Sequence, residues 1–328
     1  MERKWSQIIG AFVLGVLMPA LMLRLTGLTR PVDGVQPEKL PTEAVVETTD
    51  RCIPPEYHLP VLSGNTVVTV ELDTYLVGVV LGEMPAYFDE EALMAQAVVA
   101  RTYAVRHHVF RDKHPGGAVC TDPGCCQAYV SETVYVERGG DRSDVEKVKR
   151  AVENTAGWVL TYDGEYIDAT YFSCSGGWTE DALAVWGADI PYLQAVESPG
   201  ENGAESYRHT VTFSSREFQD LLGRNLTVRP ESWFGPVTLT KGGGVATMII
   251  GGKTYAGTQL RQLLGLNSSA FTMNVVGDRI VVTTSGTGHR VGMSQEGAEA
   301  MAVSGSTWQE ILLHYYQGIR IDKLSQIG

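Results

Sequence analysis

The sequence predicts an α+β fold, because helical and strand-like segments are interspersed without the strict alternation of a doubly wound sheet. The composition supports a folded protein with a sizeable core, since 44% of the 328 residues are hydrophobic and 20% are charged. Short β-rich pieces also gather between residues 205 and 275, apart from two helical patterns nearer the N-terminus. We therefore expect a mixed α/β domain in which residues 205–275 could form a separate lobe.

Residues 1–28 predict an N-terminal transmembrane helix. Ile8 to Leu23 is an uncharged and mostly apolar run, which Leu25 to Leu28 extend past Arg24, whose long stem can reach an interface. A cleavable signal peptide is the alternative, but no A-x-A site stands near the end of the run. Arg3 and Lys4 before it favour an N-terminus inside the cell and an extracytoplasmic remainder.

Residues 29–60 are rich in proline and acids and predict a tether, so residues 61–321 are expected to form the ectodomain. The formal net charge of the chain is -12. Nucleic acid is excluded as a partner by this charge, because phosphate binding requires clustered lysine and arginine.

The first half of the ectodomain predicts strands and helices in turn. Asp73 is expected to cap the helix that ends at Glu83, and Asp89 a longer helix with closely spaced alanines that suit a buried position. The expected elements are a strand at Val67–Leu72, helices at Asp73–Glu83, Glu90–Phe110 and Ser143–Thr155, and strands at Trp158–Tyr162 and Ile167–Ser173.

The second half predicts shorter pieces. Gly251 and Gly252 favour a turn, and Thr307 with Glu310 forms the pattern of a capping box. The expected elements are strands at Val237–Leu239, Ala246–Ile250 and Arg279–Thr284, a helix at Gly257–Leu264, a helix from Ser294, and a last helix ending near Gly318.

Glu83 is the strongest candidate for chemistry. It closes a helix whose apolar face carries Leu76, Val79 and Val80. A carboxylate in the last turn meets the negative end of the helix dipole, and desolvation beside an apolar stripe also disfavours its charge. Both effects favour a raised pKa, so we hypothesise that Glu83 donates a proton in catalysis. The alternative is that Glu83 turns outward into water at a frayed helix end.

His114, Cys120, Cys125 and Cys126 lie within one loop that also contains glycine and proline. Imidazole and thiolate are preferred ligands of zinc, and such a loop gains stability from a cross-link. In an extracytoplasmic protein, disulfide bonds are an equally valid explanation. Because the chain has five cysteines, one has to stay unpaired or bind something else.

Two glycine-containing motifs could contact a ligand. SCSGGWTE, at Ser173 to Glu180, offers hydroxyls beside glycines that allow close backbone approach, although a polar turn explains it as well. SGTGHRVGMSQEGAEAMA, at Ser285 to Ala302, places His289 ahead of a helix, where an ordinary glycine turn is the alternative.

Three ordered groups of segments resemble the stage II sporulation protein D (SpoIID) family over roughly Val67 to Gly318. They are YLVGVVLGEMP followed by EALMAQAVVARTYA, YFSCSGGWTE with VWG and PYLQAVESP, and GHRVGMSQEGAEAMA with ILLHYYQG. Members of this family are membrane-anchored peptidoglycan lytic transglycosylases. The resemblance implies cleavage of the β-1,4 bond between N-acetylmuramic acid and N-acetylglucosamine, which leaves a 1,6-anhydro end.

The resemblance also implies site residues. The catalytic glutamate falls on Glu83, and the structural zinc ligands of some members fall on His114, Cys120 and Cys126. Candidates for lining a glycan-binding groove are Arg101, Tyr103, Tyr171, Ser173, Ser175, Thr179, His289 and Gln295. The sequence departs from the family at three places: Cys125 is an extra thiol, Arg290 stands where glycine is usual, and Glu296 stands where an aromatic residue is common.

The family acts on glycan strands during engulfment in endospore formation. The resemblance implies two partners, an amidase (SpoIIP) that strips stem peptides and a membrane scaffold (SpoIIM), and an ectodomain that faces the septal wall from the mother-cell membrane. A zinc-dependent amidase or peptidase and a non-catalytic glycan-binding scaffold are the alternative functions.

Overall fold

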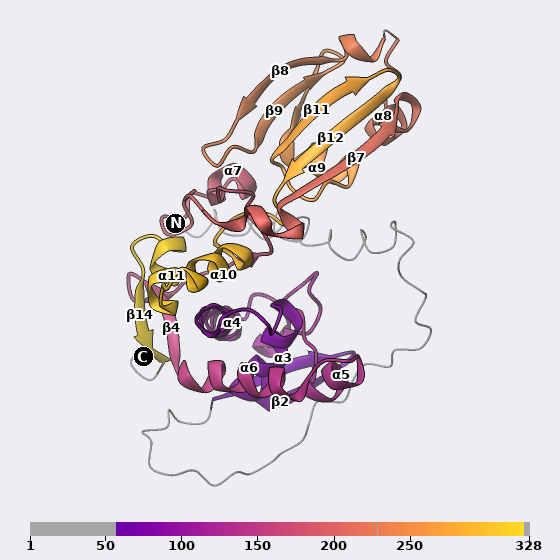
Figure 1. The fold of residues 1–328 in the computed structure, drawn as a ribbon. Coiled ribbons are helices and arrows are strands. Elements are labelled where there is room, and N and C mark those ends of the chain that lie inside the picture. The colour runs from indigo at the N-terminus through magenta and orange to yellow at the C-terminus, as the bar shows by residue number, and fades with distance from the viewer. Residues whose placement is uncertain (1–56, 228, 325–328) are drawn as a thin grey trace, which may run out of the picture. The chain divides into compact units, whose positions relative to one another are not determined.

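The computed structural model describes residues 57–227 and 229–324 (Figure 1). The expected transmembrane helix at 1–28 and most of the expected tether at 29–60 lie outside these residues. Within them, no helix is both long and apolar enough to cross a membrane. Regular structure begins slightly before the expected domain boundary, because Pro60 already belongs to strand β1 (His58–Ser63).

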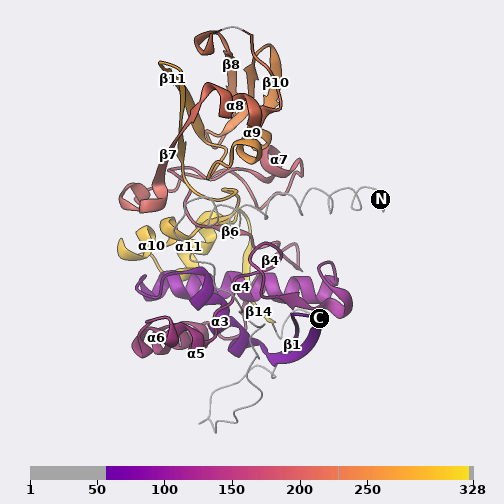
Figure 2. The same cartoon turned by 90° about the vertical axis from the view of Figure 1, so that its right-hand side faces the viewer.

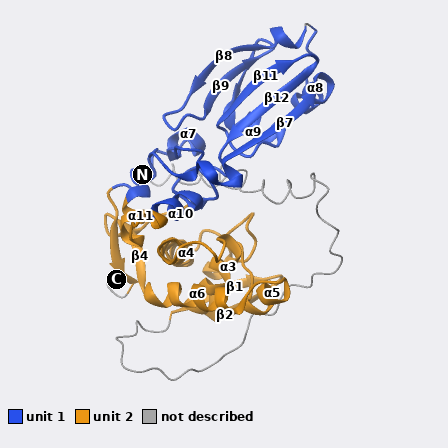
Figure 3. Ribbon diagram, in the orientation of Figure 1, with its two compact units in different colours: residues 1–18, 171–301, 314–317 blue, residues 19–170, 302–313, 318–328 orange. Residues whose placement is uncertain are grey.

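The chain divides into two compact units, shown in blue and orange in Figure 3. Unit 1 contains Tyr171–Met301 and His314–Gln317, and unit 2 contains the described residues up to Thr170 together with Ala302–Leu313 and the residues from Gly318. Both units mix helices and strands, so the protein has the expected α+β character.

Three helices of unit 2 pack against one another: α3 (Leu72–Glu83), α4 (Glu90–Phe110) and α6 (Arg142–Asn154) (Figure 2). The prediction of a buried α4 is confirmed, because its small alanines allow neighbouring backbones to come close. The five alanines of the helix are fully buried, namely Ala92, Ala95, Ala97, Ala100 and Ala104. A short helix that the sequence analysis missed, α5 (Glu132–Glu137), precedes α6.

Of the two N-terminal caps expected for α3 and α4, the one for α4 is correct. The Asp89 carboxylate accepts the Glu91 N–H at 2.9 Å and caps α4 as predicted. The prediction that Asp73 caps α3 is wrong, because Glu71 accepts the N–H groups of both Asp73 and Thr74. Asp73 lies in the first turn instead, where its carboxylate is available to a partner from α4.

Two small sheets belong to unit 2. In one, β1 pairs antiparallel with β2 (Thr66–Glu71) and parallel with β3 (Val119–Cys120). In the other, β4 (Trp158–Tyr162) lies between β5 (Glu165–Tyr166) and β14 (Arg320–Lys323).

The expected strand at Ile167–Ser173 is largely wrong. Only Tyr171–Phe172 forms a strand, β6, which pairs in parallel with β13 (Met293–Ser294) in unit 1. Before it, the Thr170 N–H donates to the Asp168 carbonyl at 2.9 Å, so the chain turns where an extended strand was expected.

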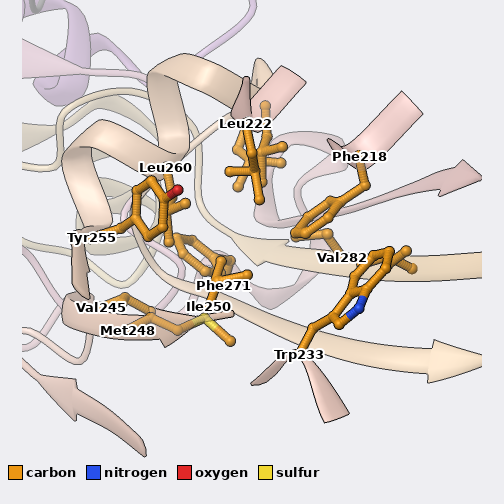
Figure 4. Packing of buried hydrophobic residues seen from close by; sticks show 13 residues of the cluster. Phe218, Leu222, Trp233, Val245, Met248, Ile250, Tyr255, Leu260, Phe271 and Val282 are labelled. Atoms are coloured by element: carbon orange, nitrogen blue, oxygen red, sulfur yellow. The ribbon is translucent and has the colours of Figure 1, made fainter. Parts of the chain in front are cut away.

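Unit 1 contains two three-stranded antiparallel sheets, ordered β10-β9-β8 and β11-β12-β7. Phe218 stacks on Trp233 with ring centroids 6.1 Å apart, inside a buried cluster to which these sheets and two helices contribute (Figure 4). The elements are β7 (Arg208–Ser214), α8 (Ser215–Leu222), β8 (Phe234–Leu239), β9 (Val245–Ile250), β10 (Lys253–Ala256), α9 (Gly257–Leu264), β11 (Phe271–Val276) and β12 (Arg279–Ser285).

The remaining elements are short. Around Thr307 the predicted capping box is present, because its N–H and hydroxyl both donate to Glu310 at 2.8 and 3.0 Å. The helices are α7 (Ala182–Trp186), α10 (Gln295–Val303) and α11 (Trp308–Tyr315), and the 3-10 turns are Pro115–Gly117, Glu201–Gly203, Glu205–Tyr207 and Pro230–Ser232.

Candidate functional site

Glu83 is the last residue of α3 and lies half-buried at its C-terminal end. The apolar face behind it is packed as expected, with Leu76, Val79 and Val80 fully buried. Its Oε1 accepts the backbone N–H of Ala128 at 2.5 Å. The carboxylate is therefore held by a main-chain donor that lies 45 residues further along the chain.

Two glycines of α3 bring that donor into place. A Cβ on Gly78 would stand 2.2 Å from the Tyr129 ring, and one on Gly82 would stand 2.9 Å from the Tyr129 nitrogen. The Val130 N–H donates to the Gly78 carbonyl at 2.9 Å. The segment 128–130 thus packs directly against the helix backbone, a role for these glycines that the sequence analysis did not identify.

The loop before this segment brings together all four predicted or possible metal ligands. The donor atoms of His114, Cys120, Cys125 and Cys126 lie within 4.8 Å of one another. All three thiols are free, so the disulfide alternative is absent from this loop as the structure describes it. One imidazole and three thiols in such a cluster match the preferred donor set of zinc, so these residues fit that metal.

The thiols also interact with one another. The hydrogen bond from Cys126 is the largest cause that lowers the pKa of the Cys120 thiol to about 5, with further hydrogen bonds from the Asp122 backbone, His114 and Cys125. Burial, followed by the negative charge of Cys120, raises the pKa of the Cys125 thiol. The cluster therefore favours one thiolate at neutral pH, and a bound cation would stabilise the others in the same form.

Tyr103 belongs to the surroundings of this cluster. Its hydroxyl lies 3.5 Å from the Cys125 carbonyl, its side chain is buried, and its ring packs 4.2 Å from that of His107. Burial raises the pKa of Tyr103 well above its usual value. Tyr103, which was expected to line a groove, is instead buried beside the possible metal ligands.

The structure contradicts a ligand-facing role for Arg101. Its guanidinium is fully buried and pairs with Asp73 at 3.0 Å. The same group donates to the backbone carbonyls of Val152, Thr155 and Trp158. Because each of its N–H groups already has an acceptor inside unit 2, none remains for a sugar.

In unit 1 the two glycine-containing motifs come together. Strands β6 and β13 pair, the Glu296 N–H donates to the Ser173 carbonyl at 3.0 Å, and Cys174 bridges to Thr287. Tyr171 and Ser173 are partly exposed beside this junction, whereas Gln295 is nearly buried at the start of α10.

Ser175 and Thr179 are internal, contrary to the expectation that they face a ligand. The Ser175 N–H and hydroxyl donate to the buried carboxylate of Glu201 at 2.9 and 2.7 Å. The Thr179 hydroxyl is buried and accepts the Val196 N–H at 2.8 Å. Glu201 was not predicted, because nothing local in its sequence connects it with a motif 25 residues earlier.

His289 lies half-buried beside two aromatic rings. Burial, with a contribution from the positive charge of Arg261, lowers the pKa of His289 to about 3. Its Nδ1 accepts the Val291 N–H at 3.1 Å, and its ring lies against those of Phe172 and Trp186. The imidazole is therefore suited to packing and offers no positive charge to a ligand.

Comparison with known proteins gives the family. A family model described as stage II sporulation protein (SpoIID) matches residues 63–162. The chain is 42% identical to stage II sporulation protein D of Bacillus subtilis (strain 168) over 266 residues, which cover 80% of this chain and 77% of that protein. The chain belongs to the stage II sporulation protein D family. Stage II sporulation protein D of Bacillus amyloliquefaciens is 41% identical over 80% of this chain and 77% of its own length.

A more distant relative is the amidase enhancer of Bacillus subtilis (strain 168). It is 28% identical over 74% of this chain but only 39% of its own length. Membership of the stage II sporulation protein D family connects the chain with sporulation.

Arg290 is the family departure that the structure explains. Its φ is +67°, in the left-handed region that favours glycine, the usual residue at this place in the family. Its guanidinium pairs with the fully buried Glu180 at 3.2 Å and donates to the carbonyls of Ser175, Trp178 and Gly242. Arg290 thus forms a buried ion pair within unit 1, although its backbone conformation is strained.

Proposed function

We propose that this protein is a peptidoglycan lytic transglycosylase in which Glu83 is the catalytic acid and base. The observation that carries the proposal is the placement of Glu83: it ends a buried helix, lies half-exposed, and is oriented by the Ala128 N–H at 2.5 Å. A catalytic carboxylate needs such a fixed direction together with access to substrate. Family membership supports the same assignment.

Glu83 would serve twice in one reaction. As an acid it protonates the oxygen that bridges N-acetylmuramic acid and N-acetylglucosamine while positive charge develops on the sugar ring. The resulting carboxylate then takes the proton from the C6 hydroxyl of the muramic residue. That hydroxyl attacks the anomeric carbon and forms the 1,6-anhydro end. Because the nucleophile belongs to the substrate, the reaction needs no second protein carboxylate.

The junction of the two motifs in unit 1 is the proposed source of further glycan contacts. Tyr171 and Ser173 are partly exposed there, and the Trp178 side chain is 44% exposed although both neighbours, Gly177 and Thr179, make backbone hydrogen bonds. An exposed indole on a fixed backbone is suited to stacking on a sugar ring. Arg101, Ser175 and Thr179 are left out of this proposal.

Zinc is proposed as a structural ion. His114, Cys120 and Cys126 would hold it, and its chemistry would be to cross-link a loop that otherwise has little regular structure. Through residues 127 and 128 the cross-linked loop leads to the donor that orients Glu83.

The cellular setting is a proposal that rests on the family and on the sequence. We place residues 1–28 in the mother-cell membrane as a single anchor, with the ectodomain on the side of the septal wall. Peptide-stripped glycan strands would be the substrate during engulfment, with the amidase SpoIIP and the scaffold SpoIIM as partners.

Replacement of Glu83 tests the proposal. We expect the purified full chain to release 1,6-anhydro products from peptide-free glycan strands, and Glu83→Gln to lower that rate by about 10²- to 10⁴-fold. Mass spectrometry identifies these products, because each is lighter by one water than the product of hydrolysis. Glu153→Gln, at an exposed glutamate of α6, is the matched control and keeps the full rate.

Other products would favour the alternative functions. Release of stem peptides that stops on chelation would identify a zinc amidase or peptidase. Binding of glycan without any cleavage product would identify a scaffold. Full activity of Glu83→Gln would remove Glu83 from the mechanism.

A further inference from the structure

One of the three thiols in the loop that carries His114, Cys120, Cys125 and Cys126, called the metal loop below, has a position that the family pattern does not explain. Cys125 precedes Cys126, and the family pattern of one histidine and two cysteines leaves it without a role. Its Sγ lies 3.3 Å from His114 Nε2, a distance close to that between two atoms that bind the same metal ion. Ligand atoms of a tetrahedral zinc site, bound at about 2.0 to 2.3 Å, lie about 3.5 Å from one another.

The backbone of Cys125 is held so that this thiol faces the cluster. Its carbonyl is within 3.2 Å of Lys113 Nζ and 3.5 Å of the Tyr103 hydroxyl, and its N–H donates to the Asp122 carbonyl at 2.9 Å. Both backbone polar groups of the residue are thus occupied by the protein. Cys126 N–H shares the Asp122 acceptor, so two adjacent cysteines are oriented by one turn.

The local charge suits three thiolates. A zinc ion bound by three thiolates and a neutral imidazole has a net charge of minus one, and an uncompensated charge in a half-buried loop is unfavourable. The Lys113 ammonium, held at the Cys125 carbonyl, supplies the compensating charge.

We propose that Cys125 is a zinc ligand together with His114, Cys120 and Cys126, so that the loop forms a closed site with four protein ligands. A closed set leaves no position for water or substrate, and such sites are structural rather than catalytic. The ion in this protein then stabilises the loop and takes no part in bond cleavage. This inference does not depend on the proposed transglycosylase activity.

Cobalt substitution of the purified full chain counts the thiolates. Cobalt(II) in place of zinc gives a near-ultraviolet charge-transfer absorbance that scales with the number of bound thiolates. We expect one cobalt per chain, and a loss of about one third of this absorbance in Cys125→Ser, because two of three thiolates remain. Cys174→Ser is the matched control, since Cys174 is a buried thiol of unit 1 and does not belong to the cluster, and it keeps the full absorbance.

Alkylation of the unmutated chain gives an independent measurement if Cys125→Ser does not fold. In the zinc form, Cys125 is expected to resist iodoacetamide as Cys120 and Cys126 do, and a chelator should expose all three together. Peptide mass mapping reads each site. Full charge-transfer absorbance in Cys125→Ser, rapid alkylation of Cys125 alone in the zinc form, or failure of the chain to bind either metal would overturn the proposal.

Discussion

At the scale of single residues, Arg101 and Arg290 form ion pairs inside the protein. Both are buried, and both bond to carbonyls and to one carboxylate of their own unit. Breaking a buried ion pair by removing one partner costs about 3 to 5 kcal/mol, since the other charge and the orphaned carbonyls remain. Substitution of either arginine is therefore expected to lower stability strongly, although the sequence analysis placed Arg101 in a ligand groove.

Arg101→Lys separates a structural role from a ligand role. A lysine has three donors on one nitrogen and cannot satisfy Asp73 and three carbonyls at once, so we expect a loss of about 3 kcal/mol or more in stability. Urea unfolding measures it, with Arg150→Lys at an exposed position of α6 as the control. Unchanged stability together with lost activity would restore Arg101 to the substrate site.

Arg290→Gly has two opposing effects on stability: it relieves backbone strain, and it removes one partner of a buried ion pair. Glycine relieves about 1 to 2 kcal/mol of left-handed strain, whereas the unpaired Glu180 costs about 3 to 5 kcal/mol, so we expect a net loss of about 1 to 4 kcal/mol in stability. Urea unfolding tests the sign. Arg111→Gly is the matched control, because Arg111 also has a positive φ of +54° but is exposed at the end of α4, so its substitution should be neutral or stabilising.

At the scale of elements, the link between the metal loop and α3 decides where the proposed catalytic acid points. The loop leads from Cys126 to Ala128, and the following residues pack on the glycine surface of the helix. A charge-assisted hydrogen bond such as that from Ala128 to Glu83 contributes about 1.5 to 3 kcal/mol. Loss of this hydrogen bond should therefore slow the reaction even when the possible metal ligands are unchanged.

Ala128→Pro removes the backbone donor to Glu83. Proline has no backbone N–H, so we expect the rate of anhydro-product release to fall by about 10- to 100-fold while the zinc content stays constant. Ala128→Gly keeps the N–H and should stay within a few-fold of the unmutated rate. A proline variant with full activity would show that the Ala128 N–H does not orient Glu83.

At the scale of the whole molecule, both units contain acidic groups that folding keeps protonated. Burial raises the pKa of Tyr57 in unit 2 to about 12, and in unit 1 it raises the pKa of Cys174 to about 12 and that of Tyr315 above its usual range. In the unfolded chain these groups lose their protons from about pH 9 to 10 upward. The unfolded state then binds fewer protons than the folded state, so stability falls as pH rises.

We therefore expect the free energy of unfolding to fall between about pH 10 and 12, by up to about 1.4 kcal/mol per pH unit for each such group, and the urea midpoint to fall with it. Tyr315→Phe removes one of these groups and should make the decline shallower. Tyr87→Phe, at a tyrosine that is 78% exposed, is the control and should leave the decline unchanged. A midpoint that does not change over this range would contradict the burial of these groups.

Comparison of sequence and structure separates local from long-range information. The bounds of α4, β4 and α9 agree with the prediction, because caps, glycine turns and residue periodicity act over a few positions. The errors at Asp73 and at Ile167–Ser173 occur where Glu71 and a turn at Thr170 compete successfully for the same backbone groups. Local competition of this kind is decided by which hydrogen bonds the rest of the fold allows.

The sequence by itself determined the family, the α+β class, the helix that ends at Glu83 and the four possible metal ligands, since each depends on residue types at short spacing. Only the tertiary structure decided that the Ala128 N–H donates to Glu83, that the Cys125 thiol lies beside the other three possible metal ligands, and that Arg101, Ser175 and Thr179 are internal. The physical reason is that a buried polar group has to find a partner, and that partner can lie anywhere in the chain.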